Sequence, residues 1–214
     1  MIEPAYLEPT RHSYDTVAAD YARLLKDELA ASPFERAMLG AFAEHVDGPV
    51  ADLGCGTGRI TGHLAALGLD VFGVDLSPGM IAVARRSLPG LRFEVGSILD
   101  LDLPDGGLAG VVAWYSIIHT PPELLPRVFA EFHRVLAPGG HLALAFQVGE
   151  EVVHLREGYG HPVVLDAYRL SPSHIEEHLA AAGFVMTARM RREAARWEPT
   201  PQVYLFARRP ADVP

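Results

Sequence analysis

Apolar positions at the start of the chain recur at the spacing of an α-helix. Between residues 13 and 29 they come three or four positions apart, which places them on one helix face. These positions are Tyr14, Val17, Tyr21, Leu24 and Leu25. A second helix is predicted from 33 to about 45, because Ser32 can cap its first turn and Pro33 suits its first position.

After residue 47, short apolar runs alternate with helical segments. Strands are predicted over 50–53, 70–74, 91–95, 110–115 and 141–146, with helices over 59–66, 78–87 and 122–136 between them. Gly68 ends the first of these helices, Ser77 caps the second, and Pro138-Gly139-Gly140 turns the chain into the fifth strand. Strands that alternate with helices pair in parallel. The pattern therefore predicts an α/β fold, in which a doubly wound, mostly parallel sheet carries helices on both faces.

The last part of the chain departs from this alternation. A helix is predicted over 172–182, and two strands follow over 184–191 and 202–207, joined by the turn-prone run Glu198-Pro199-Thr200-Pro201. The segment 147–170 fits neither a strand nor a long helix, and we expect it to cover the functional site as a cap. Residues 210–214 are expected to be a disordered tail.

Composition bounds the class of protein. With 214 residues, of which 49% are apolar, the chain can form one large domain around a sizeable core. No run reaches the ~18 apolar residues of a membrane helix, and the N-terminus lacks the pattern of a signal peptide. A single cysteine cannot form an internal disulfide, which favours a reducing cytoplasm. The net charge of −9 disfavours a nucleic-acid partner.

A turn rich in glycine is the strongest chemical signal. The strand 50–53 runs into Gly54, Gly56 and Gly58, and a helix follows at once. Glycines remove the side chains that would keep a ligand off the backbone, so main-chain N–H groups and the positive helix end can face a polar ligand. Asp75 ends the next strand, 21 positions after Gly54, where a carboxylate can accept both hydroxyls of a ribose.

The glycine spacing does not fit a dinucleotide. That fingerprint is G-x-G-x-x-G, and its third glycine would fall on Arg59 or Thr61 in the two possible frames. The chain has D-x-G-x-G-x-G instead, with Asp52 beside the turn. A carboxylate there would repel a pyrophosphate, but it suits a ligand that carries an ammonium or sulfonium group.

From about Tyr14 to Arg208 the chain resembles the class I S-adenosylmethionine-dependent methyltransferases of the small-molecule type, whose first motif has this form. The resemblance implies a single Rossmann-like sheet of seven strands with an antiparallel last strand. It also implies S-adenosylmethionine as the cofactor, a helical lid over 1–46 and a cofactor-binding domain over 47–209. The cofactor-binding residues that it implies are Asp52, Gly54, Cys55, Gly56, Gly58, Asp75, Leu76, Met80, Ser97, Ile98 and Tyr115.

Two departures qualify the resemblance. The residue after Gly96, at the adenine-binding corner, is commonly an acid in the family and is Ser97 here, a shorter and weaker acceptor. The acid that usually opens the fourth strand is replaced by Ala109-Gly110.

The side chain of Cys55 is expected to pack in the turn, because Asp52 nearby argues against a reactive thiolate.

His119 is the candidate general base. It follows the fourth strand, beside the first, where the strand order reverses and open α/β sheets bind ligands. The alternative is a histidine that bonds only to loop backbone. The residues expected to shape the acceptor pocket are Tyr14, Tyr21, His154, Tyr159, His161 and Tyr168, although plain packing explains them nearly as well. No metal site is expected, because no pair of these side chains has the spacing of one.

The sequence thus predicts methyl transfer from S-adenosylmethionine to a nitrogen, oxygen or carbon atom of a small molecule. We expect a monomer or homodimer without nucleic-acid or membrane partners. Three alternatives stay open: a non-catalytic S-adenosylmethionine-binding sensor or partner subunit, an NAD-dependent oxidoreductase, and a protein methyltransferase, whose bulky substrate a cap should block.

Overall fold

A seven-stranded sheet forms the centre of the molecule. The computed structural model describes residues 4–211, and the strand order is β3-β2-β1-β4-β5-β9-β8. The strands are β1 Val50–Leu53, β2 Val71–Asp75, β3 Phe93–Val95, β4 Leu108–Trp114, β5 Leu136–Gln147, β8 Val185–Arg192 and β9 Gln202–Arg208. The first five pair in parallel, whereas β9 is antiparallel to both β5 and β8. The predicted mostly parallel α/β sheet with an antiparallel last strand is confirmed.

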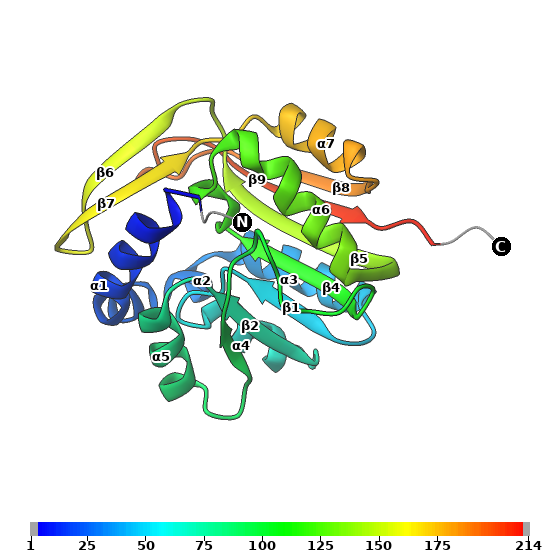
Figure 1. The fold of residues 1–214 in the computed structure, drawn as a ribbon, viewed down its shortest axis with the longest axis horizontal. Helices are drawn as coiled ribbons and strands as arrows, with labels where there is room; N and C mark the ends of the chain where they lie inside the picture. The colour runs from blue at the N-terminus through cyan, green and yellow to red at the C-terminus, as the bar shows by residue number, and fades with distance from the viewer. Residues whose placement is uncertain (1–3, 212–214) are drawn as a thin grey trace.

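Helices cover both faces of this sheet (Figure 1). One face packs against α3 (Pro33–His45), α4 (Arg59–Ala66) and α5 (Pro78–Ser87), and the other against α6 (Leu125–Val135) and α7 (Pro172–Ala181). Successive residues of a strand point to opposite faces. In β4, Val111 packs with the α6 side and Val112 with the α3 side, and both are fully buried. A strand covered on both faces needs a continuous apolar run, which is what its sequence has.

The bounds of β1, α3, α4 and α5 agree with those predicted from sequence. Their start and stop signals act as expected. The Ser77 hydroxyl accepts a hydrogen bond from the Met80 N–H at 3.0 Å, which caps α5. Gly68 follows α4 with φ 95°, the left-handed conformation that ends many helices.

The N-terminal helices differ from the prediction. α1 spans Leu7–Leu25 rather than 13–29, and a short helix, α2 (Glu28–Ala31), follows after a break. Pro9 lies in the first turn of α1, where a backbone N–H has no partner within the helix. Proline is therefore tolerated there, and the helix begins six residues earlier than expected.

Most of the other strands and helices differ from the predicted bounds by one or two residues, but two elements begin three residues or more from their predicted starts. The helix predicted over 122–136 is a 3₁₀ turn, Pro122–Leu124, followed by α6, because Pro126 has no N–H and suits a new helix start. β5 begins at Leu136 and includes Pro138-Gly139-Gly140, which were predicted as a turn. The β4–β5 register shifts beside this run, and such an irregularity admits proline and glycine into a strand.

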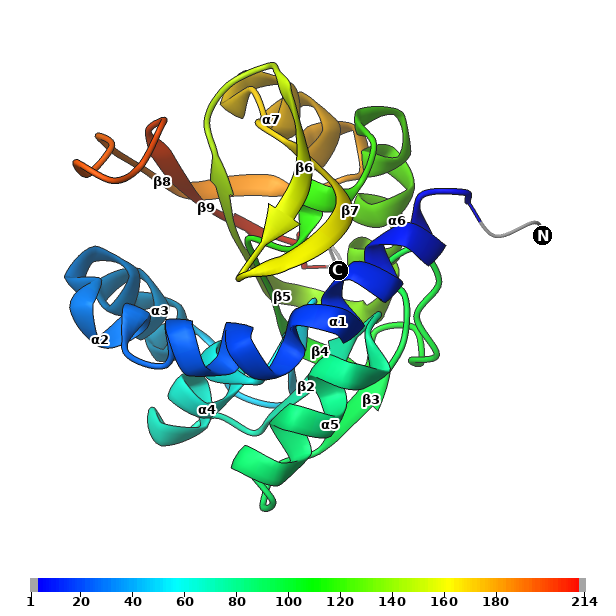
Figure 2. The ribbon, with the colours of Figure 1, turned by 90° about the vertical axis from the view of Figure 1, so that its left-hand side faces the viewer.

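The segment 147–170 contains two strands, so the prediction that it has none is wrong. β6 (Val152–Gly158) and β7 (His161–Tyr168) pair antiparallel as a separate two-stranded sheet. Only one face of this hairpin is buried: Val163, Leu165 and Ala167 pack inward, whereas Val164 is 56% exposed. Figure 2 shows α1 between the hairpin and α5.

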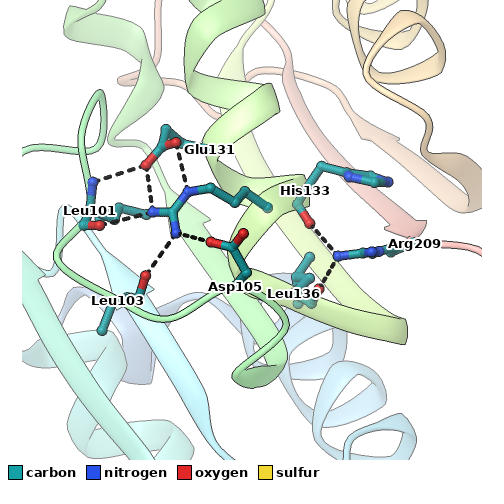
Figure 3. Close-up of polar contacts among 8 residues, drawn as sticks. Leu101, Leu103, Asp105, Glu131, His133, Leu136 and Arg209 are labelled. Atoms are coloured by element: carbon teal, nitrogen blue, oxygen red, sulfur yellow. Dashed lines mark hydrogen bonds and ion pairs between the residues drawn. The ribbon is translucent and has the colours of Figure 1, made fainter.

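Arg134 of α6 holds the connection from β3 to β4, and Figure 3 labels its partners Leu101, Leu103, Asp105 and Glu131. Its guanidinium donates to the carbonyl oxygens of Leu101 and Leu103 and pairs with Asp105 and Glu131. Glu131 in turn accepts from the Leu101 N–H at 3.0 Å. A single arginine thus satisfies the polar groups of a long connection and fixes its path across the sheet.

Two predictions concern the ends of the chain: the disordered tail over 210–214 and the lid over 1–46. Pro210 and Ala211 have no regular secondary structure. The remaining residues of the predicted tail, 212–214, and residues 1–3 of the predicted lid lie outside the described residues. Within residues 4–211, no helix combines the length and the apolar character needed to cross a membrane.

Candidate active site

A cavity lies between α1 and the carboxyl ends of β1 to β4, with about 790 Å³ of empty space including its mouth. The predicted site residues that line it are Gly54, Gly56, Asp75, Leu76, Met80, Ser97, Ile98, Tyr115, Tyr14, Tyr21 and His119. Strand order reverses between β1 and β4, so this is the switch point of the sheet. The structure therefore gathers most of the predicted residues at the predicted edge.

The glycines of the turn have three different surroundings. A Cβ on Gly54 would lie 2.2 Å from the Cβ of Ser116, so the turn packs directly against the loop after β4. A Cβ on Gly58 would meet Phe93 at 2.8 Å, on the side away from the cavity. Gly56, with φ 55°, would meet nothing within 4 Å. Gly56 is thus the glycine whose open side faces ligand space.

Asp75 stands in the middle of the cavity wall. Its two carboxylate oxygens accept hydrogen bonds from the Gly56 N–H and the Ser77 N–H, each at 2.8 Å. Burial raises the pKa of this carboxyl to about 6, against the lowering effect of the two N–H donors. Because each oxygen has more than one lone pair, the carboxylate can still accept hydroxyl donors from a ligand.

Asp52 does not line the cavity, in contrast to the prediction. Its side chain is buried, and the Thr61 hydroxyl of α4 donates to it at 2.6 Å. Burial raises its pKa to about 7. Asp52 therefore ties α4 to β1 from below the turn. It contacts no ligand space directly, because its strand points it toward the α4 face.

Cys55 also points away from the cavity. Its thiol packs with Ile81, Ala84 and Phe93, and a Cβ on Gly73 would lie 2.6 Å from its sulfur. Burial raises the pKa of the thiol well above its usual value, so it stays protonated and unreactive. This agrees with the expected packing role of the side chain.

The opposite end of the cavity is made by the loop after β3 and by α5. Leu76, Met80, Ser97 and Ile98 line it, which gives a largely apolar slot with one hydroxyl. The Ser97 hydroxyl accepts from the Leu99 N–H at 3.2 Å. This end suits a flat, partly polar ring.

Tyr14, His119 and Asp166 form a chain of hydrogen bonds at the cavity wall. Tyr14 Oη lies 2.6 Å from His119 Nε2, and His119 Nδ1 lies 2.8 Å from the carbonyl oxygen of Asp166. A carbonyl oxygen can only accept, so Nδ1 carries the proton and Nε2 accepts from the Tyr14 hydroxyl. Burial lowers the pKa of His119 and raises that of Tyr14 well above its usual value, so both are neutral near pH 7.

Helix α1 is tied to the walls on either side of the cavity. On one side, the Asp15 carboxylate accepts from the Ser77 hydroxyl at 2.6 Å and from the Gly79 N–H at 2.7 Å, at the start of α5. On the other side, the Ser13 hydroxyl bonds both the N–H and the carbonyl oxygen of Val164 in β7, each at 3.0 Å. α1 is therefore a fixed roof over the sheet edge.

Four predicted acceptor-pocket residues lie in the hairpin and do not line the cavity. His154 pairs with Asp166 on the exposed face, and His161 pairs with Asp20 of α1, at 2.7 and 2.8 Å. The Tyr159 ring contacts the Tyr21 ring with a centroid distance of 4.9 Å. Tyr168 is half-buried against the main core. In this structure they hold the hairpin rather than line the cavity.

The cavity also includes residues that were not singled out from sequence: Tyr6, Leu7, Thr10, Arg59, Trp114, Ser116 and Thr120. The first three come from the early start of α1, which helical spacing upstream of residue 13 could have indicated. The positions of Arg59, Trp114 and Ser116 depend on how the turn packs against the loop after β4. No local pattern predicts that packing.

Comparison with known proteins agrees with this geometry. A family described as methyltransferase domain matches residues 50–140. An uncharacterized methyltransferase of Mycobacterium tuberculosis is 37% identical over 105 residues, which cover 48% of this chain and 41% of that protein. A trans-aconitate 2-methyltransferase of Methylobacterium nodulans is 43% identical over 100 residues, covering 44% and 36%. The chain spans less than half the length of these curated relatives.

The fold similarity extends over nearly the whole chain. A crystal structure of the Burkholderia thailandensis 1,6-didemethyltoxoflavin-N1-methyltransferase, with its substrate and S-adenosylhomocysteine bound, has a TM-score of 0.76 at 22% identity. The match covers 98% of this chain and 92% of that one. Residues 50–140 thus match a methyltransferase domain, and the chain as a whole has the fold of this S-adenosylhomocysteine-binding methyltransferase.

Proposed function

We propose that this protein transfers a methyl group from S-adenosylmethionine to a small-molecule acceptor. The observation that carries the proposal is the pairing of Asp75 with the open turn at Gly56. A carboxylate and a bare backbone lie side by side on one cavity wall, at the edge where the sheet reverses. Few ligands need both a diol acceptor and close contact with glycine backbone, and a nucleoside with a charged tail is one of them.

The residues present fit this cofactor. Asp75 would hold the ribose hydroxyls, the slot of Met80, Ser97 and Ile98 would hold the adenine, and the turn at Gly54 and Gly56 would hold the methionine portion. An unsatisfied group supports the fit: the Ser116 hydroxyl beside the turn is buried without a hydrogen-bond partner among the described residues. Buried polar groups normally have partners, so this hydroxyl is available to a ligand.

The bound sulfonium supplies an already activated methyl group, so the protein must mainly align the acceptor and exclude water. If the acceptor carries a proton, the Tyr14–His119 pair can remove it. The acceptor's proton would pass to Tyr14 Oη as the tyrosine's own proton passes to His119 Nε2. Asp166 holds the opposite ring nitrogen and would stabilise the imidazolium. This makes His119 a base that acts through Tyr14.

A small acceptor is favoured by the roof over the site. α1 lies over the edge of the sheet at the cavity, and the β6–β7 hairpin packs against α1 and the turn Ile117–His119, as a lid and a cap would. Related proteins are named for small acceptors, trans-aconitate and 1,6-didemethyltoxoflavin. We assign residues 4–46 as the lid and the hairpin as the cap. The single, buried cysteine suits the cytoplasm as the site of action.

Isothermal titration calorimetry tests the cofactor assignment. We expect saturable binding of S-adenosylhomocysteine and none of NADH. Asp75→Asn keeps the shape of the side chain and removes its charge, and we expect about 10- to 100-fold weaker S-adenosylhomocysteine binding, equivalent to about 1.5–3 kcal/mol. Glu94→Gln is the matched control, because this carboxylate is on the neighbouring strand, is 44% exposed and does not line the cavity. Unchanged affinity in Asp75→Asn would contradict the ribose assignment.

A non-catalytic S-adenosylmethionine-binding protein is the second candidate. It is favoured by one observation, that both ring nitrogens of His119 are already engaged. Incubation with cofactor labelled in the methyl group and a pool of cell metabolites separates the two. Transfer of label to a metabolite supports the enzyme, and tight binding without transfer supports the sensor.

A further inference from the structure

Arg59 is a charged group inside the cavity whose function the preceding assignments do not explain. It is the first residue of α4, directly after Gly58, whose φ of 82° turns the chain into the helix. Of the described residues that line the cavity, it alone carries a permanent positive charge. Its side chain is 19% exposed, so most of it is removed from water.

The hydrogen bonds of Arg59 are incomplete. Its Nη2 pairs with Glu28 Oε2 at 2.9 Å. Nε and Nη1 are buried and have no hydrogen-bond partner among the described residues. A buried guanidinium normally has its donors satisfied, because a buried donor without a partner is costly. Two free N–H groups on one planar fork match the geometry of a carboxylate.

The neighbouring carboxylates do not accept hydrogen bonds from Nε and Nη1 of Arg59. Arg59 lowers the pKa of the buried Glu35 and Asp52 carboxyls, which burial itself raises, so its charge acts on both. Glu35, however, bonds the Trp114 indole at 2.8 Å, and Asp52 bonds Thr61. The guanidinium contacts the half-exposed Glu28 and the Tyr21 hydroxyl, whose pKa it lowers against the raising effect of burial, but these contacts leave Nε and Nη1 without a partner. Arg59 is thus a mostly buried cation whose Nε and Nη1 can donate to a ligand.

The order of the strands indicates which ligand carboxylate reaches this point. Along the sheet edge the slot at Ser97 comes first, Asp75 second, and the turn with Arg59 third. A nucleoside that places its base at Ser97 and its ribose at Asp75 extends its amino-acid tail toward Arg59. We propose that Arg59 binds the carboxylate of the methionine portion of S-adenosylmethionine. This assignment rests on the proposed function and adds the residue that recognises the charged end.

Two probe ligands test the assignment without any acceptor. S-adenosylhomocysteine has the carboxylate, and 5′-methylthioadenosine has the same nucleoside thioether without it. In calorimetry, Arg59→Gln is expected to bind S-adenosylhomocysteine about 10- to 100-fold more weakly and to leave 5′-methylthioadenosine binding within about twofold. Arg59→Lys keeps the charge without the fork, and we expect an intermediate loss.

Arg23→Gln is the matched control, because Arg23 is 66% exposed on α1 and pairs with Asp20. It removes the same charge outside the cavity and should change neither affinity. Retained 5′-methylthioadenosine binding also shows that Arg59→Gln is folded. Equal weakening of both ligands, or an unchanged affinity for S-adenosylhomocysteine, would overturn the assignment. If the unaltered protein binds neither probe, the proposed function itself fails, which is a different result.

Discussion

At the scale of single residues, Gly54 and Gly56 show how one turn serves packing and binding separately. Both have positive φ, 76° and 55°. A side chain on Gly54 would collide with Ser116, whereas a side chain on Gly56 would enter open space in the cavity. We therefore expect the fold to require the first glycine and the ligand to require the second.

Paired alanine variants should separate these two requirements. Gly54→Ala forces a clash and a left-handed alanine, and we expect it to lower the free energy of unfolding by about 2–4 kcal/mol. Gly56→Ala adds only the conformational strain, about 1–2 kcal/mol, but should weaken S-adenosylhomocysteine binding. Urea unfolding and calorimetry measure the two effects. Equal losses of stability would show that contact with Ser116 does not constrain the turn.

Buried Asp52 predicts a pH dependence of stability. In the folded protein its pKa is about 7, so it holds its proton to higher pH than an unfolded aspartate, whose pKa is near 3.8. Stability therefore falls as the pH rises from about 4 to about 7 and levels off at higher pH, with a fall of about 2 kcal/mol between pH 5.5 and 8 from this residue. Asp75, with a pKa raised to about 6 by burial, acts in the same direction.

We expect Asp52→Asn to reduce that fall by about 2 kcal/mol, because the amide does not ionise but can still accept from Thr61. Unfolding by urea at pH 5.5 and pH 8, in both proteins, measures the difference. Asp100→Asn, on an exposed carboxylate, serves as the control. Parallel pH profiles for Asp52→Asn and the unaltered protein would mean that Asp52 is ionised throughout this range.

Tyr14 and His119 should behave as one unit in catalysis. Once a labelled acceptor is identified, Tyr14→Phe and His119→Asn should each lower kcat by about 100-fold. The double variant should fall no further, since removing either residue breaks the same proton path. S-adenosylhomocysteine affinity should stay within about threefold, because neither group is assigned to the cofactor. Additive losses in kcat would indicate two independent roles.

At the scale of elements, α1 is placed by two short polar contacts rather than by the sheet. Asp15 fixes it to the start of α5, and Ser13 fixes it to β7. The Ser13 hydroxyl is buried and serves both backbone groups of Val164. This side chain therefore joins α1 to the backbone of the hairpin, beside the His161–Asp20 pair and the Tyr21–Tyr159 ring contact.

Ser13→Ala should loosen this junction locally. Both backbone groups of Val164 lose their partner, which costs about 1–3 kcal/mol at this point. We expect hydrogen exchange of the Val164 amide to accelerate at least about tenfold while β1 and β4 are unaffected. Thr16→Ala removes a hydroxyl from the exposed face of the same helix and should change neither. Uniform acceleration would indicate global destabilisation instead.

The elements that could be predicted from sequence are those with local signals. Pro33, Ser77 and Gly68 mark helix ends by their own chemistry, and β1 and α4 are bounded by the glycine turn. The β6–β7 hairpin has no comparable signal. Only alternate residues of β7 are buried, the apolar Val164 is exposed between two of them, and Pro162 interrupts the strand pattern. Its burial comes from α1, a distant element, so a local pattern cannot reveal it.

At the scale of the whole molecule, the site has one part that a local sequence signal predicts and another that depends on distant contacts. The cofactor wall is a local motif, so Gly56 and Asp75 could be placed from spacing alone. The hairpin side chains His154 and His161 were predicted to face the acceptor, but the sequence could not show that they pair with Asp166 and Asp20 instead. Arg59 was missed because its free donors appear only after Glu28 and the turn are brought together.

The hairpin pairs only with itself and forms no ladder with the seven-stranded sheet. These two strands can therefore be exchanged, lengthened or given other side chains without changing how β1, β2 and β3 pair. The cavity wall at Gly56 and Asp75 depends on that pairing. If the hairpin is the cap over the acceptor, a change of substrate in this scaffold needs only a graft between residues 148 and 170. The specificity for the methyl donor would be retained, because the residues that line the cavity lie outside the hairpin.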